Sequence, residues 1–159
     1  MKRIASFYKV SEKEYLKSST KEIYDDILLP KRATSGSAGY DFFAPERYFV
    51  KSGETITVPT GIRVKIDEGW VLKIYPRSSL GFKYRLNLNN TVGIIDSDYY
   101  YSENEGHIFI KLTNCGEKDL EIEKGKAFAQ GVFVEYGITY DDDATEVRTG
   151  GIGSTDKQK

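Results

Sequence analysis

The chain has 159 residues, of which 39% are hydrophobic, and its formal net charge is -1. This length suits one globular domain with its own core. The near-neutral charge, without a block of Lys or Arg, argues against direct nucleic-acid binding or a membrane surface. The single Cys115 excludes an intramolecular disulfide, and no Cys and His cluster offers a zinc site. The first residues lack the hydrophobic region of a signal peptide, and the sequence has no run of about 18 apolar residues that could span a membrane. We therefore expect the protein in the cytoplasm.

The N-terminal extension, about residues 1–30, carries the helical signal of the chain. Ser11 and Glu14 have the spacing of a capping box, and apolar residues follow as far as Ile27. We expect one or two helical turns here, packed on the body of the protein. Pro30 and the small-residue loop 34–39 end this region.

The rest of the chain predicts short β-strands separated by turns. Apolar and polar residues alternate in several segments, with the period of half-buried strands. The predicted strands are residues 55–58, 62–66, 70–74, 108–112 and 132–134. Turn residues occupy 51–54, 67–69, 114–117 and 123–125. This spacing favours an all-β sandwich or jelly roll.

The segment Gly93–Tyr99 is the first candidate for chemistry. Its apolar residues end in Asp96-Ser97-Asp98, followed by Tyr99. A carboxylate at the end of a buried strand is partly desolvated and can accept a proton from water. A solvated turn after a core strand explains the same residues, and by themselves they favour that interpretation.

Two further segments have the donors that phosphate oxygens require. Arg77 supplies a forked cation beside the hydroxyls of Ser78 and Ser79, although a strand-ending turn with an exposed arginine explains them equally well. The glycine-rich tail from Arg148 to Asp156 exposes backbone N–H groups that can wrap an anion. A disordered terminus is the alternative for the tail.

Five segments in this order resemble the motifs of the trimeric deoxyuridine triphosphatase (dUTPase) family, in its phage-type or Gram-positive bacterial form. The segments are residues 38–44, 76–80, 93–99, 128–130 and the glycine-rich tail. The resemblance covers nearly the whole chain. It implies a distorted jelly roll, the dUTPase-like β-clip, as a single domain over residues 1–147. Residues 148–159 are then a mobile arm that closes as a lid on another subunit, in a homotrimer with shared active sites.

The resemblance also implies a reaction. Water attacks the α-phosphorus of dUTP with Mg2+ on the triphosphate, giving dUMP and pyrophosphate. This keeps uracil out of DNA and supplies dUMP for dTMP synthesis. Asp96 is similar to the catalytic carboxylate that activates the water. Asp41 resembles the carboxylate that holds the metal through a water molecule, and capping of the glycine-rich turn before it is the alternative role.

The resemblance implies three groups of substrate-binding residues. Asn90, together with the backbone around Gly93, Ile95 and Phe109, would read uracil in a hairpin too narrow for a 5-methyl group. Tyr99 would pack on the deoxyribose and exclude a 2'-hydroxyl. The phosphates would be held by Arg77, Ser78, Ser79 and Gln130, and closed over by Arg148, Gly151, Ser154 and Thr155.

The chain departs from the family pattern at several positions. Ile152 stands where the family has an aromatic residue, the tail is one residue short after Arg148, and Asp156 stands where glycine is common. Ala127 takes the place of a frequent arginine, and residues 100–106 lengthen the hairpin after Tyr99.

Two alternative functions stay open. One is a dCTP deaminase of the same fold. The other is a nucleotide-gated regulator that binds a protein partner through the long hairpin. The only histidine, His107, is expected in a surface or hairpin role.

Overall fold

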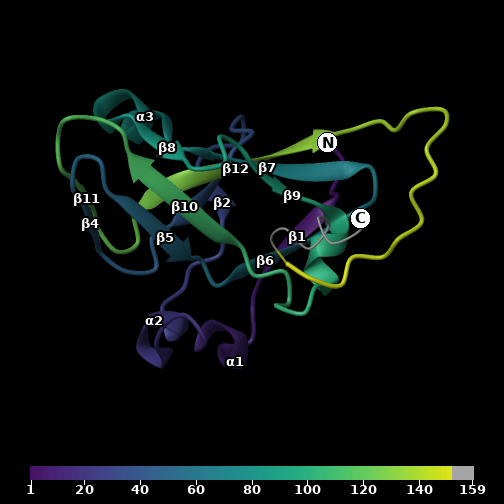
Figure 1. The fold of residues 1–159 in the computed structure, drawn as a ribbon, viewed down its shortest axis with the longest axis horizontal. Coiled ribbons are helices and arrows are strands. Elements are labelled where there is room, and N and C mark those ends of the chain that lie inside the picture. Colours follow the sequence, from purple (N-terminus) through teal and green to yellow (C-terminus); the bar gives the residue numbers. More distant parts are fainter. Residues whose placement is uncertain (152–159) are drawn as a thin grey trace.

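The computed structural model describes residues 1–151, and strands dominate this part of the chain (Figure 1). The strands are β1 (Ala5–Lys9), β2 (Lys31–Arg32), β3 (Tyr40–Phe43), β4 (Tyr48–Val50), β5 (Thr55–Pro59), β6 (Ile62–Ile66), β7 (Trp70–Pro76), β8 (Leu86–Leu88), β9 (Gly93–Ile95), β10 (Phe109–Asn114), β11 (Leu120–Ile122) and β12 (Ala127–Glu135). The helices are α1 (Glu12–Tyr15), α2 (Lys21–Asp25), α3 (Ser78–Tyr84) and the 3-10 helix η1 (Ser97–Tyr101). The all-β prediction is confirmed.

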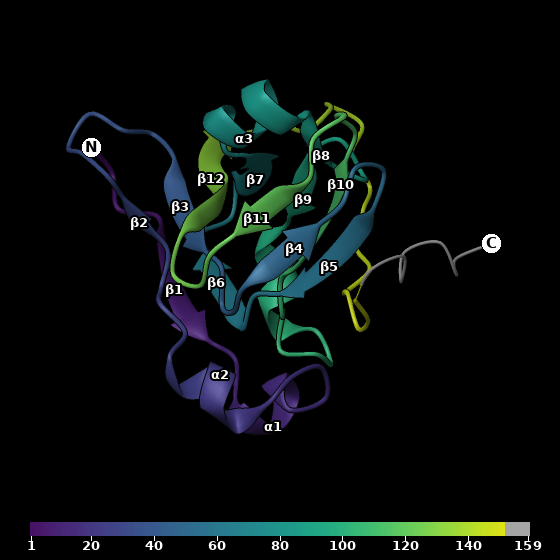
Figure 2. The same ribbon diagram turned by 90° about the vertical axis from the view of Figure 1, so that its left-hand side faces the viewer.

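The strands pair antiparallel in four small sheets. The largest has the order β2-β3-β12-β7-β9, and the others are β5-β10-β8, β11-β4 and β1-β6. Figure 2 shows β3 and β12 on one side of the molecule, β4, β5 and β10 on the other, and the N-terminal helices below them. The core between them includes Phe42, Leu72, Leu112 and Phe128, each at most 1% exposed. In residues 1–151, no helix has the length and apolar content that crossing a bilayer requires.

The alternating segments form the predicted strands because their apolar side chains share one face. In β6, Ile62, Val64 and Ile66 are buried, whereas the side chains between them are half-buried or exposed. The predicted turns are also present. Gly69 and Gly125 have φ angles of 84° and 79°, in the left-handed region that favours glycine.

The N-terminal helical turns are confirmed as α1 and α2. Ser11 is the N-cap of α1, and its Oγ accepts a hydrogen bond from the Glu14 N–H at 3.1 Å. The reciprocal half of the capping box differs from the prediction. The Ser11 N–H donates to Oε1 of Glu105, at 2.8 Å, rather than to Glu14. Strand β1, which precedes α1 and pairs with β6, was not predicted.

Three further expectations need correction. Ser78 and Ser79, for which a strand-ending turn was one of two interpretations, begin the helix α3, which ends where Arg85 adopts a left-handed conformation with a φ of 52°. The apolar run before Asp96 is only partly buried, because Ile94 points outward and is 52% exposed. His107 does not lie on the surface; it is fully buried.

Candidate active site

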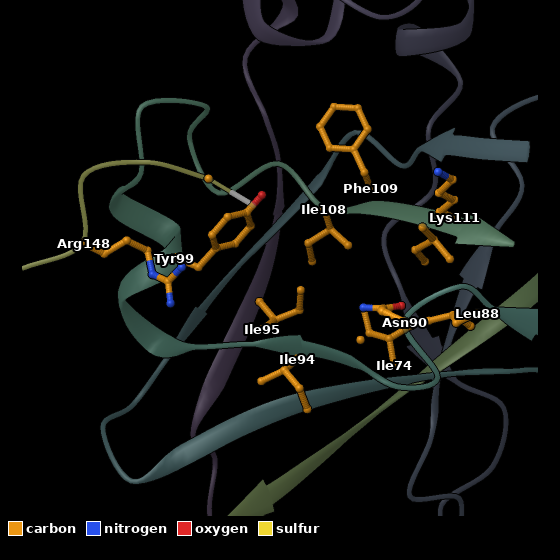
Figure 3. A pocket seen from close by; sticks show the side chains of 13 residues that line it. Ile74, Leu88, Asn90, Ile94, Ile95, Tyr99, Ile108, Phe109, Lys111 and Arg148 are labelled. Atoms are coloured by element: carbon orange, nitrogen blue, oxygen red, sulfur yellow. The ribbon is translucent and has the colours of Figure 1, made fainter. Parts of the chain in front are cut away.

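A pocket of about 240 Å³ lies between β9 and the start of β10. Figure 3 shows Tyr99 and Arg148 at one end of it and Asn90 and Leu88 at the other. The pocket brings together seven of the predicted substrate-binding residues. These are Asn90, Gly93, Ile95, Tyr99, Phe109, Arg148 and Gly151.

The backbone of β9 forms one wall of this pocket. In the largest sheet β9 is an edge strand whose sheet neighbour is β7, so part of its N–H and C=O groups face away from that sheet. Gly93 lets β9 approach β7 closely. A Cβ at this position would lie 3.1 Å from Cβ of Ile74, which is tighter than ordinary van der Waals contact. The wall therefore presents backbone donors and acceptors in fixed positions.

Tyr99, on η1, closes one end of the pocket and is 7% exposed. Its hydroxyl donates a hydrogen bond to the main-chain oxygen of His107 at 2.6 Å and accepts one from Nδ2 of Asn104 at 3.0 Å. The ring is thus fixed at its far end by the segment that follows η1.

Asp96 lies between β9 and η1, beside Tyr99 and the pocket. Its side chain is 48% exposed and accepts a hydrogen bond from Nη2 of Arg148 at 2.8 Å. Partial burial raises the pKa of Asp96 above its ordinary value, the Arg148 cation opposes that rise, and the negative charge of Asp98 adds to it. A carboxylate with a raised pKa is a better proton acceptor than an ordinary aspartate.

A second group of predicted residues lies where β3, β12 and β7 run side by side. Gln130 is in register with Asp41 on one side and with Tyr75 on the other. Nη1 of Arg77 forms an ion pair with Oδ1 of Asp41. Nε2 of Gln130 donates to the main-chain oxygen of Pro76 at 3.4 Å.

The second group is separate from the pocket. Arg77 is the N-cap residue of α3, and Ser78 and Ser79 are its first residues. None of these side chains, nor Asp41 or Gln130, lines the pocket between β9 and β10. One copy of the described chain therefore presents two separate groups of the predicted residues. Ser154, Thr155 and the substituted Ile152 lie outside the described residues.

The glycine-rich turn before Asp41 is tied to Arg32. Nη1 of Arg32 donates to the main-chain oxygens of Ser35 and Ser37, at 2.8 and 3.0 Å. Within residues 1–151, no group of three or more His, Cys, Asp or Glu side chains could hold a metal ion by itself.

Sequence reasoning missed several residues at the pocket. Lys111 lines it from β10, and Asn104 reaches both the Tyr99 hydroxyl and the C-terminal segment. A Cβ on Gly151 would lie 3.3 Å from Nδ2 of Asn104, and the N–H of Glu103 donates to the main-chain oxygen of Thr149 at 3.2 Å. The unusual length of the segment 100–106 was the sequence feature that could have pointed to Asn104. This segment lies next to the pocket.

Known proteins resemble this chain in sequence and in fold. The dUTPase family profile matches residues 25–156. A deoxyuridine 5'-triphosphate nucleotidohydrolase of Lactococcus lactis is 44% identical over 132 residues, which cover 81% of this chain and 88% of the relative. The crystal structure of a dUTPase from Streptococcus mutans matches with a TM-score of 0.68 and 37% identity, over 84% of this chain and 98% of that one.

A more distant structure shares the fold. It is a mutant dUTPase from phage phi11 of S. aureus, with a TM-score of 0.66 and 20% identity, over 92% of this chain and the whole of the other. That structure reveals the coordination of a structural Mg(II) ion. The family profile, the identity of the bacterial relatives and the common fold agree. The chain belongs to the dUTPase family.

Proposed function

We propose that this protein hydrolyses dUTP to dUMP and pyrophosphate. The observation that carries this proposal is the position of Asp96, a carboxylate with a raised pKa beside a pocket walled by an edge strand and closed by Tyr99. Family membership and the name of the Lactococcus lactis relative support the same reaction. The chain is a deoxyuridine 5'-triphosphate nucleotidohydrolase.

The pocket between β9 and β10 would hold the nucleoside. Uracil offers alternating hydrogen-bond donors and acceptors along one edge, and fixed backbone groups of β9 with the Asn90 side chain suit that pattern. The walls would be too close to admit a 5-methyl group. Tyr99 would pack against the sugar where a 2'-hydroxyl would project.

The phosphates would be bound by the second group of residues. The guanidinium of Arg77 gives a planar pair of donors, with Ser78, Ser79 and Gln130 beside it. Because Arg77 and Asp41 form an ion pair in the free chain, phosphate binding would share or displace that contact.

The residues present suit a magnesium ion that arrives with the substrate. Mg2+ keeps several waters and needs few protein ligands when phosphates supply the others, which agrees with the single carboxylate, Asp41, in the second group. Asp41 would hold the ion through a water molecule. The bound ion would neutralise charge on the triphosphate.

The proposed chemical step requires little beyond positioning and charge stabilisation. Asp96 orients a water molecule and takes its proton. The water oxygen forms a bond to the α-phosphorus, and the bond from the α-phosphorus to the bridging oxygen breaks, with pyrophosphate leaving. Arg148 balances the charge of Asp96 until the substrate arrives.

A homotrimer with shared sites explains why the two groups lie apart in one chain. One copy would contribute the pocket and Asp96, and a neighbouring copy would contribute Arg77 and its surroundings. Residues 148–159 would form the arm of each copy. Symmetric assembly of this kind places complementary patches of identical chains against each other.

Pyrophosphate release from dUTP, dTTP, dCTP and UTP, each with Mg2+, tests the proposed function. We expect rapid release from dUTP and little from the other three nucleotides. Ammonia release from dCTP, without pyrophosphate from dUTP, would instead identify a deaminase of the same fold. Comparable rates with dUTP and UTP would contradict the role of Tyr99.

A further inference from the structure

The position of the Tyr99 ring depends on the main chain at His107. The Tyr99 hydroxyl donates to the His107 carbonyl oxygen at 2.6 Å, the shorter of its two hydrogen bonds. Any shift of residues 104–107 therefore moves the anchoring point of the ring. The contacts that hold His107 in place therefore also control the shape of the pocket at Tyr99, the end proposed to bind the sugar.

The His107 side chain is held from two directions inside the core. Its Nε2 accepts a hydrogen bond from the Gly61 N–H at 2.9 Å, so the neutral imidazole carries its proton on Nδ1. Nδ1 faces Oε1 of Glu14 at 3.5 Å, a charge contact without a hydrogen bond. The imidazole packs on the ring of Phe109, with a centroid distance of 4.2 Å. The imidazole has no exposed surface through which water could replace these contacts.

Glu14 comes from the short N-terminal helix α1 and is 4% exposed. Its Oε2 accepts a hydrogen bond from Nζ of Lys17 at 2.6 Å, which leaves Oε1 directed at His107. The same helix is tied to the loop a second time. Glu105 accepts hydrogen bonds from the N–H and the Oγ of Ser11, at 2.8 and 2.5 Å.

These contacts make α1 a support for the loop that anchors Tyr99. We propose that Glu14 and His107 are positioning residues for sugar selection, linking the N-terminal helix to the ring that excludes ribonucleotides. The proposal rests on the function proposed above for Tyr99. Truncating Glu14 removes the carboxylate that faces the buried His107 Nδ1–H at 3.5 Å and leaves a cavity beside the imidazole, which costs free energy unless the loop moves. A small movement of the ring would admit a 2'-hydroxyl, since discrimination of this kind depends on close fit.

The test compares kcat/KM for dUTP with kcat/KM for UTP in four variants. In Glu14→Ala we expect the dUTP-to-UTP ratio to fall by about tenfold. Glu14→Gln keeps the size of the side chain and a carbonyl oxygen facing Nδ1–H, so we expect a ratio near that of the wild type. Glu105→Gln, at a half-exposed site, weakens the second tie and should lower the ratio less. Glu22→Ala is the matched control, because Glu22 is exposed on α2 and has no hydrogen-bond or ion-pair partner in residues 1–151.

The ratio separates positioning from general stability. A purely structural role would lower the folded fraction, reduce both kcat/KM values equally and leave the ratio unchanged. An unchanged ratio in Glu14→Ala would overturn the proposal, as would an equal fall in Glu14→Gln and Glu14→Ala. If Glu14→Ala does not fold, an unchanged ratio in Glu105→Gln would overturn it instead. Failure of the wild type to release pyrophosphate from dUTP would contradict the proposed function itself.

Discussion

Arg148 binds Asp96 through Nη2 and Oδ2 at 2.8 Å, although the two residues lie far apart in the sequence. Nε of the same side chain donates to Oδ1 of Asp98 at 2.9 Å. One guanidinium thus offsets two neighbouring negative charges at the edge of the pocket. Both carboxylates are about half exposed, so water moderates the attraction.

This relationship predicts opposite pH shifts for two variants. The ionised form of Asp96 is the active one, so kcat/KM should rise as the pH rises through the Asp96 pKa, which lies above 3.8. Arg148→Ala removes the group that opposes the raised pKa. The rise of kcat/KM on the acid side of its pH profile, the acid limb, should therefore move to higher pH. Asp98→Asn removes a charge that raises the pKa, and the acid limb should move to lower pH.

The measurement is kcat/KM for dUTP against pH in the wild type and both variants. Comparing variants with the wild type removes the titration of the substrate, which is the same in each. Shifts in the same direction for the two variants would contradict this account of Asp96.

Replacing the proposed base should separate binding from turnover. Asp96→Asn keeps the size and polarity of the side chain but cannot accept the water proton. We expect turnover to fall by about 10²- to 10⁴-fold, while the dissociation constant for dUTP changes little. Pyrophosphate release and calorimetric titration of the same preparation measure the two quantities. Near-normal release would refute the role of Asp96.

Much of the fold could be predicted because local pattern and tertiary burial agree. In β6 the alternation of Ile62, Val64 and Ile66 with polar residues matches the burial of each side chain. Strand β1 was missed because its burial is weak. No residue of β1 is fully buried, and Ala5 and Phe7 only pack against the core from its edge.

The candidate site could be predicted only in part. Asp96 and Tyr99 stand out because they end an apolar run in one short segment. The contact of Glu14 with His107 joins chain segments that only the fold brings together. Asn104 is near Tyr99 in the sequence, but its contact with the Tyr99 hydroxyl depends on the turns after η1. The sequence predicts Glu14 as the second residue of a capping box, whereas in the structure its side chain is buried in the core.

A shared active site predicts recovery of activity in mixed assemblies. Asp96→Asn removes the proposed base from one group of residues, and Arg77→Ala removes a phosphate ligand from the other. Each variant alone should have little activity. If the groups of one site come from different copies, unfolding and refolding the two variants together creates sites with both wild-type residues.

Random assortment gives up to about a quarter of the wild-type activity in an equal mixture. The control is the same mixture without refolding, which should stay inactive as long as subunits do not exchange. No recovery after refolding, with normal assembly size, would indicate that each copy builds its site alone.

The buried histidine predicts how stability depends on pH. Burial lowers the His107 pKa below its ordinary value of 6.5, while the charges of Glu14 and Glu105 oppose that shift. The folded state therefore binds fewer protons than the unfolded chain just below pH 6.5. The stabilising contribution of neutral His107 is complete above this pH and is lost as the pH falls through the window beneath it.

We expect the free energy of unfolding of the wild type to fall between about pH 7 and pH 5.5. His107→Phe keeps an aromatic ring but removes the titrating group, so the same change of pH should change the free energy of unfolding less. The variant is less stable at every pH, because the Gly61 N–H loses its acceptor. Urea unfolding at several pH values measures how the free energy of unfolding of each protein depends on pH. The protein concentration is kept fixed, because assembly would otherwise change the apparent stability. Equal slopes in the two proteins would show that His107 does not control this pH dependence, since it is the one histidine in the chain.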